Sequence, residues 1–242
     1  MPRTGDSGAP WPPVSLVVPA YQAAAWLGEA LESVAAQAYP DLDLIVVDDG
    51  STDRPEQVVA RSGLPARVLR QVNQGASTAE RRHRRARAEL IAFLDADDRL
   101  TPGSLASRVE RALAVPEADL VQGRLQRFVQ SGARGRRAAA PFGPHLANLS
   151  TILFRRRVFD TVGLLDSALL LHEDMEIMMR ATGAGLRWER IEDVVLLYRR
   201  GHGSLTERLA PRQPAASADL RPWLRLLHGR LQRRRAGTDE TR

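Results

Sequence analysis

The 242-residue chain contains no cysteine and no lysine. Without cysteine it has neither disulfides nor thiolate metal sites, so redox chemistry does not indicate the compartment. No uninterrupted apolar run reaches the roughly 20 residues that cross a bilayer. The first 13 residues lack the apolar core of a signal peptide. They are predicted to form a short flexible lead, which makes a cytoplasmic protein the default expectation.

Because lysine is absent, all 35 basic side chains are arginine, and the net charge is +6. The arginines are interleaved with 29 acids, and neither a zinc-finger nor an RNP signature occurs. This pattern favours an ordinary solvated surface, and nucleic acid is not an expected partner. With 43% hydrophobic residues, the chain is able to form the core of one large domain, with or without a tail.

The first half of the chain alternates between predicted strands and predicted helices. Apolar β-branched runs predict strands, and apolar spacings of three and four predict helices. The predicted strands are 14–19, a run from 42 into an acidic turn ending at 53, 66–71 and 90–95, and the predicted helices are 24–38, 54–62 and 76–88. This alternation predicts an α/β fold with a doubly wound parallel sheet, where ligands bind beyond the carboxyl ends of the strands.

The second half is less regular. It is predicted to contain helices at 102–114, 155–162 and 172–183, extended segments at 118–129, 149–154 and 186–199, and a Gly/Pro/Arg-rich loop at 130–145. After a linker at 209–218, Asp219 is placed to cap a basic amphipathic helix at 220–235. Such a helix packs on its own domain, docks a partner, or lies on an anionic membrane as a peripheral contact at the inner face.

Acidic residues follow two of the predicted strands. Asp48 and Asp49 end one strand, and Asp95, Asp97 and Asp98 follow another. Since both are carboxyl ends, the two clusters are expected to face one crevice. Positions 95 and 97 are two residues apart in an extended segment, so both carboxylates point toward one site. Oxygen-rich sites suit Mn²⁺ or Mg²⁺, which commonly bridge phosphates; a solvated turn is the alternative.

Six blocks of the sequence occur in an order and spacing typical of one enzyme family. They are "VVPAYQAAAWLGEALESVAAQAYPDLDLIVVDDGSTD" (17–53), "NQG" (73–75), "ARAELIAFLDADD" (86–98), "LFRRRVFDTVGLLD" (153–166), "HEDMEIMMRATGAG" (172–185) and "YRRGHGSLT" (198–206). Over roughly residues 14–206 the chain resembles the family 2 nucleotide-sugar glycosyltransferases. The resemblance implies a GT-A fold, with a Rossmann-like, mixed, mostly parallel sheet flanked by helices and followed by a C-terminal helical tail.

The resemblance also divides the chain by role. Residues 1–13 are the lead, 14–100 the nucleotide-sugar-binding half, 101–208 the acceptor-binding half of the same domain, and 209–242 the linker with the C-terminal helix. In the family, the first block surrounds the nucleotide, which assigns donor contacts to Pro19, Ala20, Tyr21 and Asp49. Tyr21 then stacks on the base, and Asp49 accepts a ring N–H or a ribose hydroxyl. The alternative is that Asp48 and Asp49 end a strand and cap the next helix.

For the second acidic cluster, the resemblance implies that Asp95 and Ala96 contact the donor on its ribose side. It implies that Asp97 binds the metal, Mn²⁺ or Mg²⁺, that bridges the donor diphosphate. Asp98 is expected to cap the helix that follows. The acids would thus hold a divalent cation and, through it, the diphosphate leaving group.

The family's general base lies in the "ED" of the block at 172–185, which corresponds to Asp174 with Glu173 beside it. Near a helix N-terminus, such a base is expected to stay ionised. Glu173 supports it or contacts the acceptor, and either acid alternatively caps the helix. In some relatives a His near His202 joins the metal or the diphosphate, whereas a lone His is otherwise structural. Arg199 and Arg200 either meet phosphate or lie on the surface.

The chain departs from the family after "NQG". The usual Ala-Arg-Asn-x-Gly is replaced, with Glu80 in the place of the Arg, which puts the usual Arg contact with the donor in doubt. Arg81 or Arg82 is a possible replacement. The five arginines in 81–87 alternatively serve an anionic acceptor or a solvated helix face. Gln22 stands where Asn is common.

Other enzyme classes are disfavoured by residues that are missing. A sugar nucleotidylyltransferase has a Gly-rich, Arg-containing loop after its first strand, and a Rossmann dehydrogenase has Gly-x-Gly-x-x-Gly; here this position reads "PAYQAAAW". Gln-x-x-Arg-Trp, the mark of processive synthases, is absent. The resemblance implies inverting, metal-dependent transfer from a nucleotide diphosphate sugar, UDP-linked as is most frequent in the family, to a hydroxyl acceptor, and the missing motif favours transfer of one sugar. A lipid-linked glycan, a peptide and a small natural product are the acceptor classes, and a catalytically degenerate binding subunit is the alternative.

Overall fold

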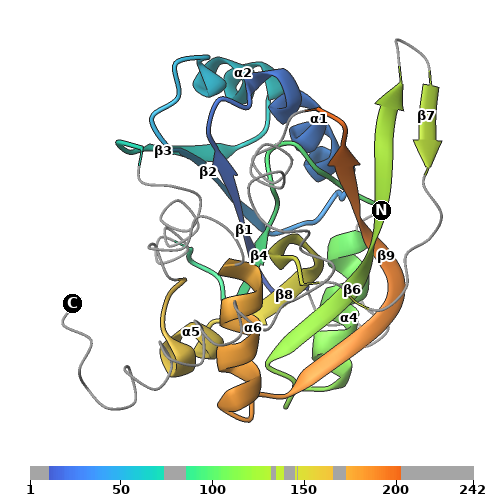
Figure 1. The fold of residues 1–242 in the computed structure, drawn as a ribbon. Coiled ribbons are helices and arrows are strands. Elements are labelled where there is room, and N and C mark those ends of the chain that lie inside the picture. Colours follow the sequence, from blue (N-terminus) through green and yellow to red (C-terminus); the bar gives the residue numbers. More distant parts are fainter. Residues whose placement is uncertain are drawn as a thin grey trace, which may run out of the picture. The chain divides into compact units, whose positions relative to one another are not determined.

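The computed structural model describes residues 11–73, 86–131, 135–138, 145, 147–165 and 173–202 (Figure 1). The chain divides into two units, Met1–Arg199 and Arg200–Arg242. The first unit contains the predicted donor and base residues.

Parallel strands form the first part of the sheet, in the order β3-β2-β1-β4. They are β1 (Val14–Ala20), β2 (Leu42–Asp48), β3 (Ala66–Arg70) and β4 (Leu90–Phe93). The helix α1 (Ala24–Ala35) connects β1 to β2, and α2 (Pro55–Ser62) connects β2 to β3. Figure 1 shows α1 and α2 lying together beside these strands. The register pairs Ala20 with Asp48, so the strands end side by side.

The sheet continues from β4 through strands of the second half, in the order β8-β6-β9-β5, with β7 paired to β6. These strands are β5 (Arg99–Leu100), β6 (Leu120–Ser131), β7 (Gly135–Ala138), β8 (Ile152–Arg155) and β9 (Trp188–Arg200). The helices of this half are α4 (Ser104–Ala114), the short 3-10 turn η2 (Leu149–Thr151), α5 (Arg157–Val162) and α6 (Glu173–Gly183). The strand pairs that join this half to β4 and to one another are antiparallel where their register is defined, so the sheet is mixed.

Both faces of the central strands are buried, because their side chains alternate between two apolar layers. Leu16 and Val18 of β1 pack in one layer with Leu27 of α1. Val17 packs in the other layer with residues such as Phe154 of β8, Phe159 of α5 and Ile177 of α6. Successive residues of a strand point to opposite faces, so this pattern requires helices on both sides of the sheet. The predicted α/β fold, a mixed sheet flanked by helices, is confirmed.

Three predicted segments differ from the structure or lie outside its described part. The predicted loop at 130–145 was wrong in part, since β6 extends to Ser131 and pairs with β7. Residues 86–88 of the predicted helix 76–88 are not helical, because Arg87 N and Ala88 N each donate to Ser15 Oγ at 3.1 Å. Residues 209–218 and 220–235, the predicted linker and tail helix, lie outside the described residues. None of the helices in the described ranges is long and apolar enough to cross a membrane.

Candidate functional site

The two acidic strand ends lie on either side of β1. Asp49 N donates to Ala20 O at 2.9 Å at the end of β1, and Leu94 N donates to Val17 O at 3.0 Å. The residues after β2 and after β4 are therefore both tied to the carboxyl-end half of one strand. This arrangement confirms that the acidic clusters share one edge of the sheet, where open α/β sheets bind their ligands.

Asp49 is 2% exposed, and its Oδ1 accepts a hydrogen bond of 2.7 Å from Gln71 Nε2. Gln71 follows β3, so the orientation of this carboxylate is set by the neighbouring strand end. Gly50 has a φ of +79°, and a Cβ on it would lie 2.9 Å from the backbone nitrogen of Asn73. Only glycine fits there, which brings the segments after β2 and β3 into close contact next to Asp49.

Asp48 closes the turn after β2 rather than capping α2. Its Oδ1 accepts from Ser51 N at 2.8 Å, and its Oδ2 lies 3.5 Å from Arg70 Nε. The alternative prediction of a helix cap is wrong for Asp48, because α2 begins after Arg54 without a side-chain cap. Tyr21 is half-exposed at the end of β1, directly after Pro19 and Ala20. The loop that carries it is tied to the same turn by Gln22 N, which donates to Ser51 Oγ at 3.2 Å.

The segment 95–98, here called the acid turn, leads from β4 into β5. The turn is closed by Asp98 N, which donates to Asp95 O at 3.0 Å. Ala96 is 5% exposed and packs in the core, so it has only its main chain to offer a ligand. Asp98 is buried and its Oδ1 accepts from Arg199 N at 2.8 Å. The expected helix cap is wrong, since α4 begins after Gly103 with no side-chain cap.

The turn η2 connects the acid turn to the start of α6. Ser150 Oγ accepts from Asp95 N at 3.2 Å and also hydrogen-bonds the Asp95 carboxyl group. The neighbouring Leu149 N donates to the carboxylate of Asp174. Asn148 Oδ1 holds this turn by accepting from Ser150 N at 2.9 Å. Adjacent residues of one turn thus bind two acids that are 79 positions apart in the sequence, 95 and 174.

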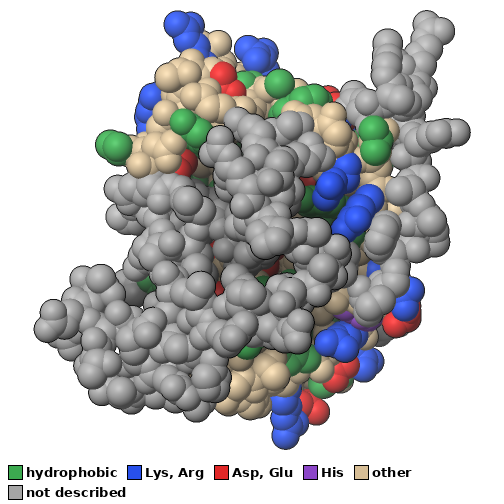
Figure 2. Space-filling model, in the orientation of Figure 1, with side chains coloured by type: hydrophobic (Ala, Val, Ile, Leu, Met, Phe, Trp, Pro, Cys, Tyr) green, Lys and Arg blue, Asp and Glu red, His purple; other side chains and the backbone are tan. Residues whose placement is uncertain are grey.

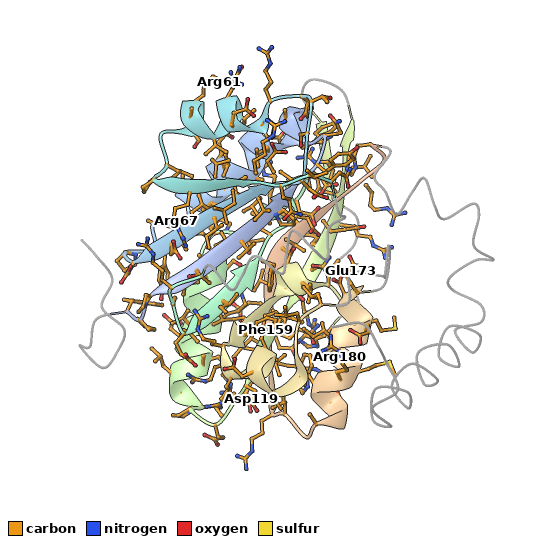
Figure 3. All side chains as sticks on the ribbon, turned by 90° about the vertical axis from the view of Figure 1, so that its left-hand side faces the viewer. Arg61, Arg67, Asp119, Phe159, Glu173 and Arg180 are labelled. Carbon is orange, nitrogen blue, oxygen red and sulfur yellow. The ribbon has the colours of Figure 1, made fainter. Side chains whose placement is uncertain are left out.

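Asp174 and Glu173 occupy the first turn of α6. Figure 3 shows Glu173 toward the middle of the unit and Arg180 further along the same helix. Arg180 fixes this helix, because its Nε donates to Glu176 Oε1 at 2.6 Å and its Nη2 donates to Leu164 O at 2.9 Å. Both members of this ion pair are buried. The position of Asp174 therefore depends on the buried contacts that Arg180 makes in the last turn of α6, as well as on η2.

The clustered acids raise one another's pKa values. Burial and the carboxylates of Asp97 and Asp174 raise the pKa of Asp95 to about 8. Burial and the charge of Glu173 raise the pKa of Asp174 to about 8, and burial together with Asp95 raises the pKa of Glu173 to about 7. Desolvation and like charge therefore oppose the helix N-terminus that was expected to keep Asp174 ionised. These couplings place Asp95, Asp97 and Asp174 in one site.

A divalent cation fits the chemistry of these residues. The donor set consists of carboxylate oxygens, and both Glu173 Oε2 and Asp98 Oδ2 are buried without a hydrogen-bond partner in the described part of the chain. No group of three or more acidic or histidine side chains with metal-binding geometry occurs among the described residues. Mg²⁺ sites of the phosphate-bridging kind use only one or two carboxylates, together with substrate phosphates and water. Asp97 and Asp95 supply this number of carboxylates.

The raised pKa values predict a pH-dependent stability. Asp174 and Glu173 have unfolded pKa values near 4 and folded values of about 8 and about 7. Between these limits the native state binds more protons than the unfolded chain, so metal-free stability falls as the pH rises from 5 to 8.5. Over this pH range the Tm of wild type is expected to fall. The Tm of the double variant Glu173→Gln, Asp174→Asn is expected to fall less, by a margin of at least about 3 °C. Equal losses in both proteins, measured by circular dichroism, would contradict the raised pKa values.

Other predicted residues are placed differently or not at all. Arg199 neither lies on the surface nor is free to meet phosphate, because it is 1% exposed and its Nε donates to Asp97 O at 2.7 Å. His202 and Arg200 belong to the second unit, and a metal role for His202 stays a prediction. Glu80, Arg81 and Arg82 lie outside the described residues. On the face drawn in Figure 2, arginines lie at several separate places rather than in one basic patch.

Sequence reasoning missed two residues of this site, Gln71 and Ser150, and gave a third, Arg199, the wrong role. For Ser150 a signal exists, since Asn148 precedes it by two positions in "ANLST", and Asn side chains commonly bond the backbone two residues on. Gln71 stands at the end of a predicted strand, but nothing local links it to Asp49. The role of Arg199 depends on pairing between distant strands.

Comparison with known proteins gives the following similarities. The model of the family described as Glycosyl transferase family 2 matches residues 15–169. The uncharacterized glycosyltransferase EpsJ of Bacillus subtilis is 25% identical over 234 residues, covering 86% of this chain and 67% of EpsJ. An uncharacterized glycosyltransferase of Nostoc is 36% identical over 102 residues, covering 40% of this chain and 32% of the relative. The chain thus spans a third to two thirds of the length of these curated relatives.

Two solved structures are similar in fold. TarS 1-349 of S. aureus, in complex with UDP-GlcNAc, aligns with a TM-score of 0.71 at 20% identity, over 89% of this chain and 65% of that one. The mannosyltransferase PcManGT of Pyrobaculum calidifontis, in complex with GDP-Man and Mn²⁺, aligns with a TM-score of 0.64 at 20% identity, over 90% of this chain and 68% of that one. The likeness to these two structures confirms the predicted GT-A fold.

Proposed function

Because the chain belongs to glycosyl transferase family 2, whose model matches residues 15–169, we propose that it is a nucleotide-sugar glycosyltransferase that moves one sugar with inversion. The proposed reaction depends on a divalent metal, is non-processive, uses a UDP-linked donor and has a hydroxyl group as acceptor. The observation that carries this proposal is the gathering of Asp95, Asp97 and Asp174 at the carboxyl edge of the sheet.

The donor nucleotide is assigned to the ends of β1 and β2. Half-exposed Tyr21 offers a ring face for the base, and Asp49, held by Gln71, offers an acceptor for a ring N–H or a ribose hydroxyl. Asp95 and the main chain of Ala96 continue the site toward the ribose. The complexes of TarS with UDP-GlcNAc and of PcManGT with GDP-Man support a nucleotide diphosphate sugar as donor.

Asp174 is proposed as the general base. Its carboxylate takes the proton of the acceptor hydroxyl, and the acceptor oxygen forms a bond to the anomeric carbon on the face opposite the nucleotide. The bond from that carbon to the diphosphate oxygen breaks, its electron pair stays on the oxygen, and the configuration inverts. The pKa of about 8 makes Asp174 a stronger base than an exposed aspartate, with an ionised fraction near neutral pH.

Asp97, with Asp95 beside it, is proposed to hold Mn²⁺ or Mg²⁺, and His202 stays a further proposed ligand from the second unit. When bound, the cation supplies Lewis-acid stabilisation of the charge on the leaving diphosphate. The Mn²⁺ in the PcManGT complex supports this cofactor. A lipid-linked glycan, a peptide or a small natural product is the proposed class of acceptor, with peripheral membrane contact through 220–235 if it is a lipid.

A thermal-shift panel tests the donor site. We expect UDP and UDP-GlcNAc to raise Tm in the presence of Mn²⁺ by about 5 °C or more at 100 times Kd, because ligand binding stabilises the native state by mass action. GDP and GDP-Man, and UDP without Mn²⁺, are expected to give smaller shifts. A folded protein that responds to none of these nucleotides would contradict the proposal and favour a catalytically degenerate binding subunit.

A further inference from the structure

Arg199 of β9 contacts the acid turn at two places. The antiparallel register pairs Leu197 with Arg99 of β5, and continuing it by two residues brings Arg199 opposite Asp97. The contacts agree with this register: Arg199 N donates to Asp98 Oδ1 at 2.8 Å, and Arg199 Nε donates to Asp97 O at 2.7 Å. One residue of β9 therefore holds both the main chain and a side chain of the turn.

The guanidinium group is itself held by other elements. Its Nη2 donates to Glu29 Oε2 of α1 at 3.0 Å. Its Cζ lies 4.8 Å from the ring centre of Trp26 and 4.7 Å from that of Phe128 in β6. With 1% of its surface exposed, the side chain has little freedom to move. A planar guanidinium that stacks on aromatic rings and donates in fixed directions cannot be reproduced by the compact ammonium group of lysine.

The location of Arg199 is more informative about its role than the fact that it is buried. A buried ion pair is weak evidence for stability, because the cost of desolvating both charges offsets much of their attraction. Arg199, however, hydrogen-bonds the backbone of Asp97, the residue assigned to the metal, in a site that otherwise gathers like charges. Groups that fix the orientation of a metal ligand change metal affinity even though they do not touch the ion.

We propose that Arg199 is a positioning residue for the donor diphosphate site, which orients the Asp97 carboxylate toward the cation by holding the acid turn from β9. This inference rests on the proposed function, because it takes Asp97 as the metal ligand. It assigns Arg199 no contact with the donor and no part in proton transfer.

Arg199→Lys tests the proposal because it keeps the charge and removes the fixed donor geometry. We expect Mn²⁺ affinity in the presence of UDP, measured by isothermal titration calorimetry, to fall by about 10- to 100-fold. The affinity for UDP without metal is expected to change by less than about twofold, because the contacts to base and ribose come from the ends of β1 and β2. A general loss of structure would weaken both affinities together.

Arg155→Lys is the matched control. Arg155 of β8 also donates to main-chain oxygens, with Nε to Ala118 O and Nη2 to Ala112 O, both at 2.8 Å. It pairs with Leu90 at the start of β4, the end opposite the acid turn. Its substitution is expected to lower Tm while leaving Mn²⁺ affinity unchanged. If Arg199→Lys does not fold, Glu29→Gln replaces it, with an expected loss of Mn²⁺ affinity of about threefold or more in the same assay.

The outcomes separate the two proposals. Wild type that binds neither UDP nor GDP with Mn²⁺ overturns the proposed function, and this inference with it. Wild type that binds UDP with Mn²⁺, together with Arg199→Lys of equal Mn²⁺ affinity, overturns this inference alone. Equal losses of Mn²⁺ affinity in Arg199→Lys and Arg155→Lys also overturn it, since the effect would then be one of general stability. Selective loss in Arg199→Lys or Glu29→Gln supports it.

Discussion

Asp174→Asn is expected to lower the turnover of whichever nucleotide sugar the thermal-shift panel identifies by about 10³-fold, while leaving the affinity for UDP and Mn²⁺ within about twofold. The amide keeps the size of the side chain and is able to accept from Leu149 N, as the carboxylate does, but it cannot take a proton from the acceptor. General-base catalysis typically contributes 10²- to 10⁴-fold. Release of UDP is the measurement, with water as the acceptor until the natural acceptor is known.

Glu173→Gln is the matched comparison for this prediction. Glu173 is the neighbouring residue of the same helix turn, and its pKa is raised by burial as that of Asp174 is. We expect a loss of turnover of less than about tenfold, because its proposed part is to support the base or contact the acceptor. If Glu173→Gln abolished turnover while Asp174→Asn retained it, the assignment of the base would move to Glu173.

Asp97→Asn is expected to remove the Mn²⁺-dependent part of nucleotide binding, with Mn²⁺ affinity in the presence of UDP at least about 100-fold weaker. Loss of a residue that merely supports a metal ligand costs about 10- to 100-fold, and loss of a ligand costs more. The thermal-shift panel and calorimetry provide the measurement. An Asp97→Asn protein that retains a Mn²⁺-dependent shift would show that the metal is held elsewhere.

The stability of the metal-free variant separates loss of function from misfolding. Asp97 raises the pKa values of Asp95 and Asp98 by charge repulsion, so its neutralisation is expected to leave the metal-free Tm at neutral pH equal to or above that of wild type. Asp97→Asn should thus reduce the nucleotide-dependent shift in Tm, whereas the metal-free Tm should rise or stay unchanged. A metal-free Tm several degrees lower would instead point to damage of the acid turn.

Short stretches of sequence predicted the features that depend mainly on neighbouring residues, namely the buried strands and their acidic ends. Continuous apolar runs in β1 and β2 predict strands that are buried on both faces, and acids directly after such strands predict the edge at which a site forms. The same reasoning predicted that Asp95 and Asp97 point toward one site, and the order of the sequence blocks added Asp174, which η2 links to Asp95 in the structure. These predictions depend on periodicity and strand ends, which short stretches of sequence carry.

Two of the predictions that were wrong, for Asp98 and Arg199, concern residues whose partners are far away in the sequence. Asp98 looks like a helix cap from its neighbours, but it accepts from Arg199 N, which is 101 positions later. Arg199 lies among polar residues and glycine, which favours an exposed position until β9 pairs with β5. The pKa of Asp174 is raised first by burial in the folded chain, which the helix end alone does not indicate. In each case tertiary contacts outweigh a correct local rule.

Pairing between β5 and β9 also determines when, during synthesis of the chain, the acid turn is able to take its final form. The parallel strands β1 to β4 are complete once residue 93 has been made, whereas Arg199 reaches Asp97 across 102 positions of chain. Contacts of such separation close late, because the entropy of the intervening loop opposes them. In a chain emerging from the ribosome, β1 to β4 are therefore present well before β9 is available to hold the acid turn from its other side. We expect the acid turn to take its final form only when β9, the last of the described strands, has been made.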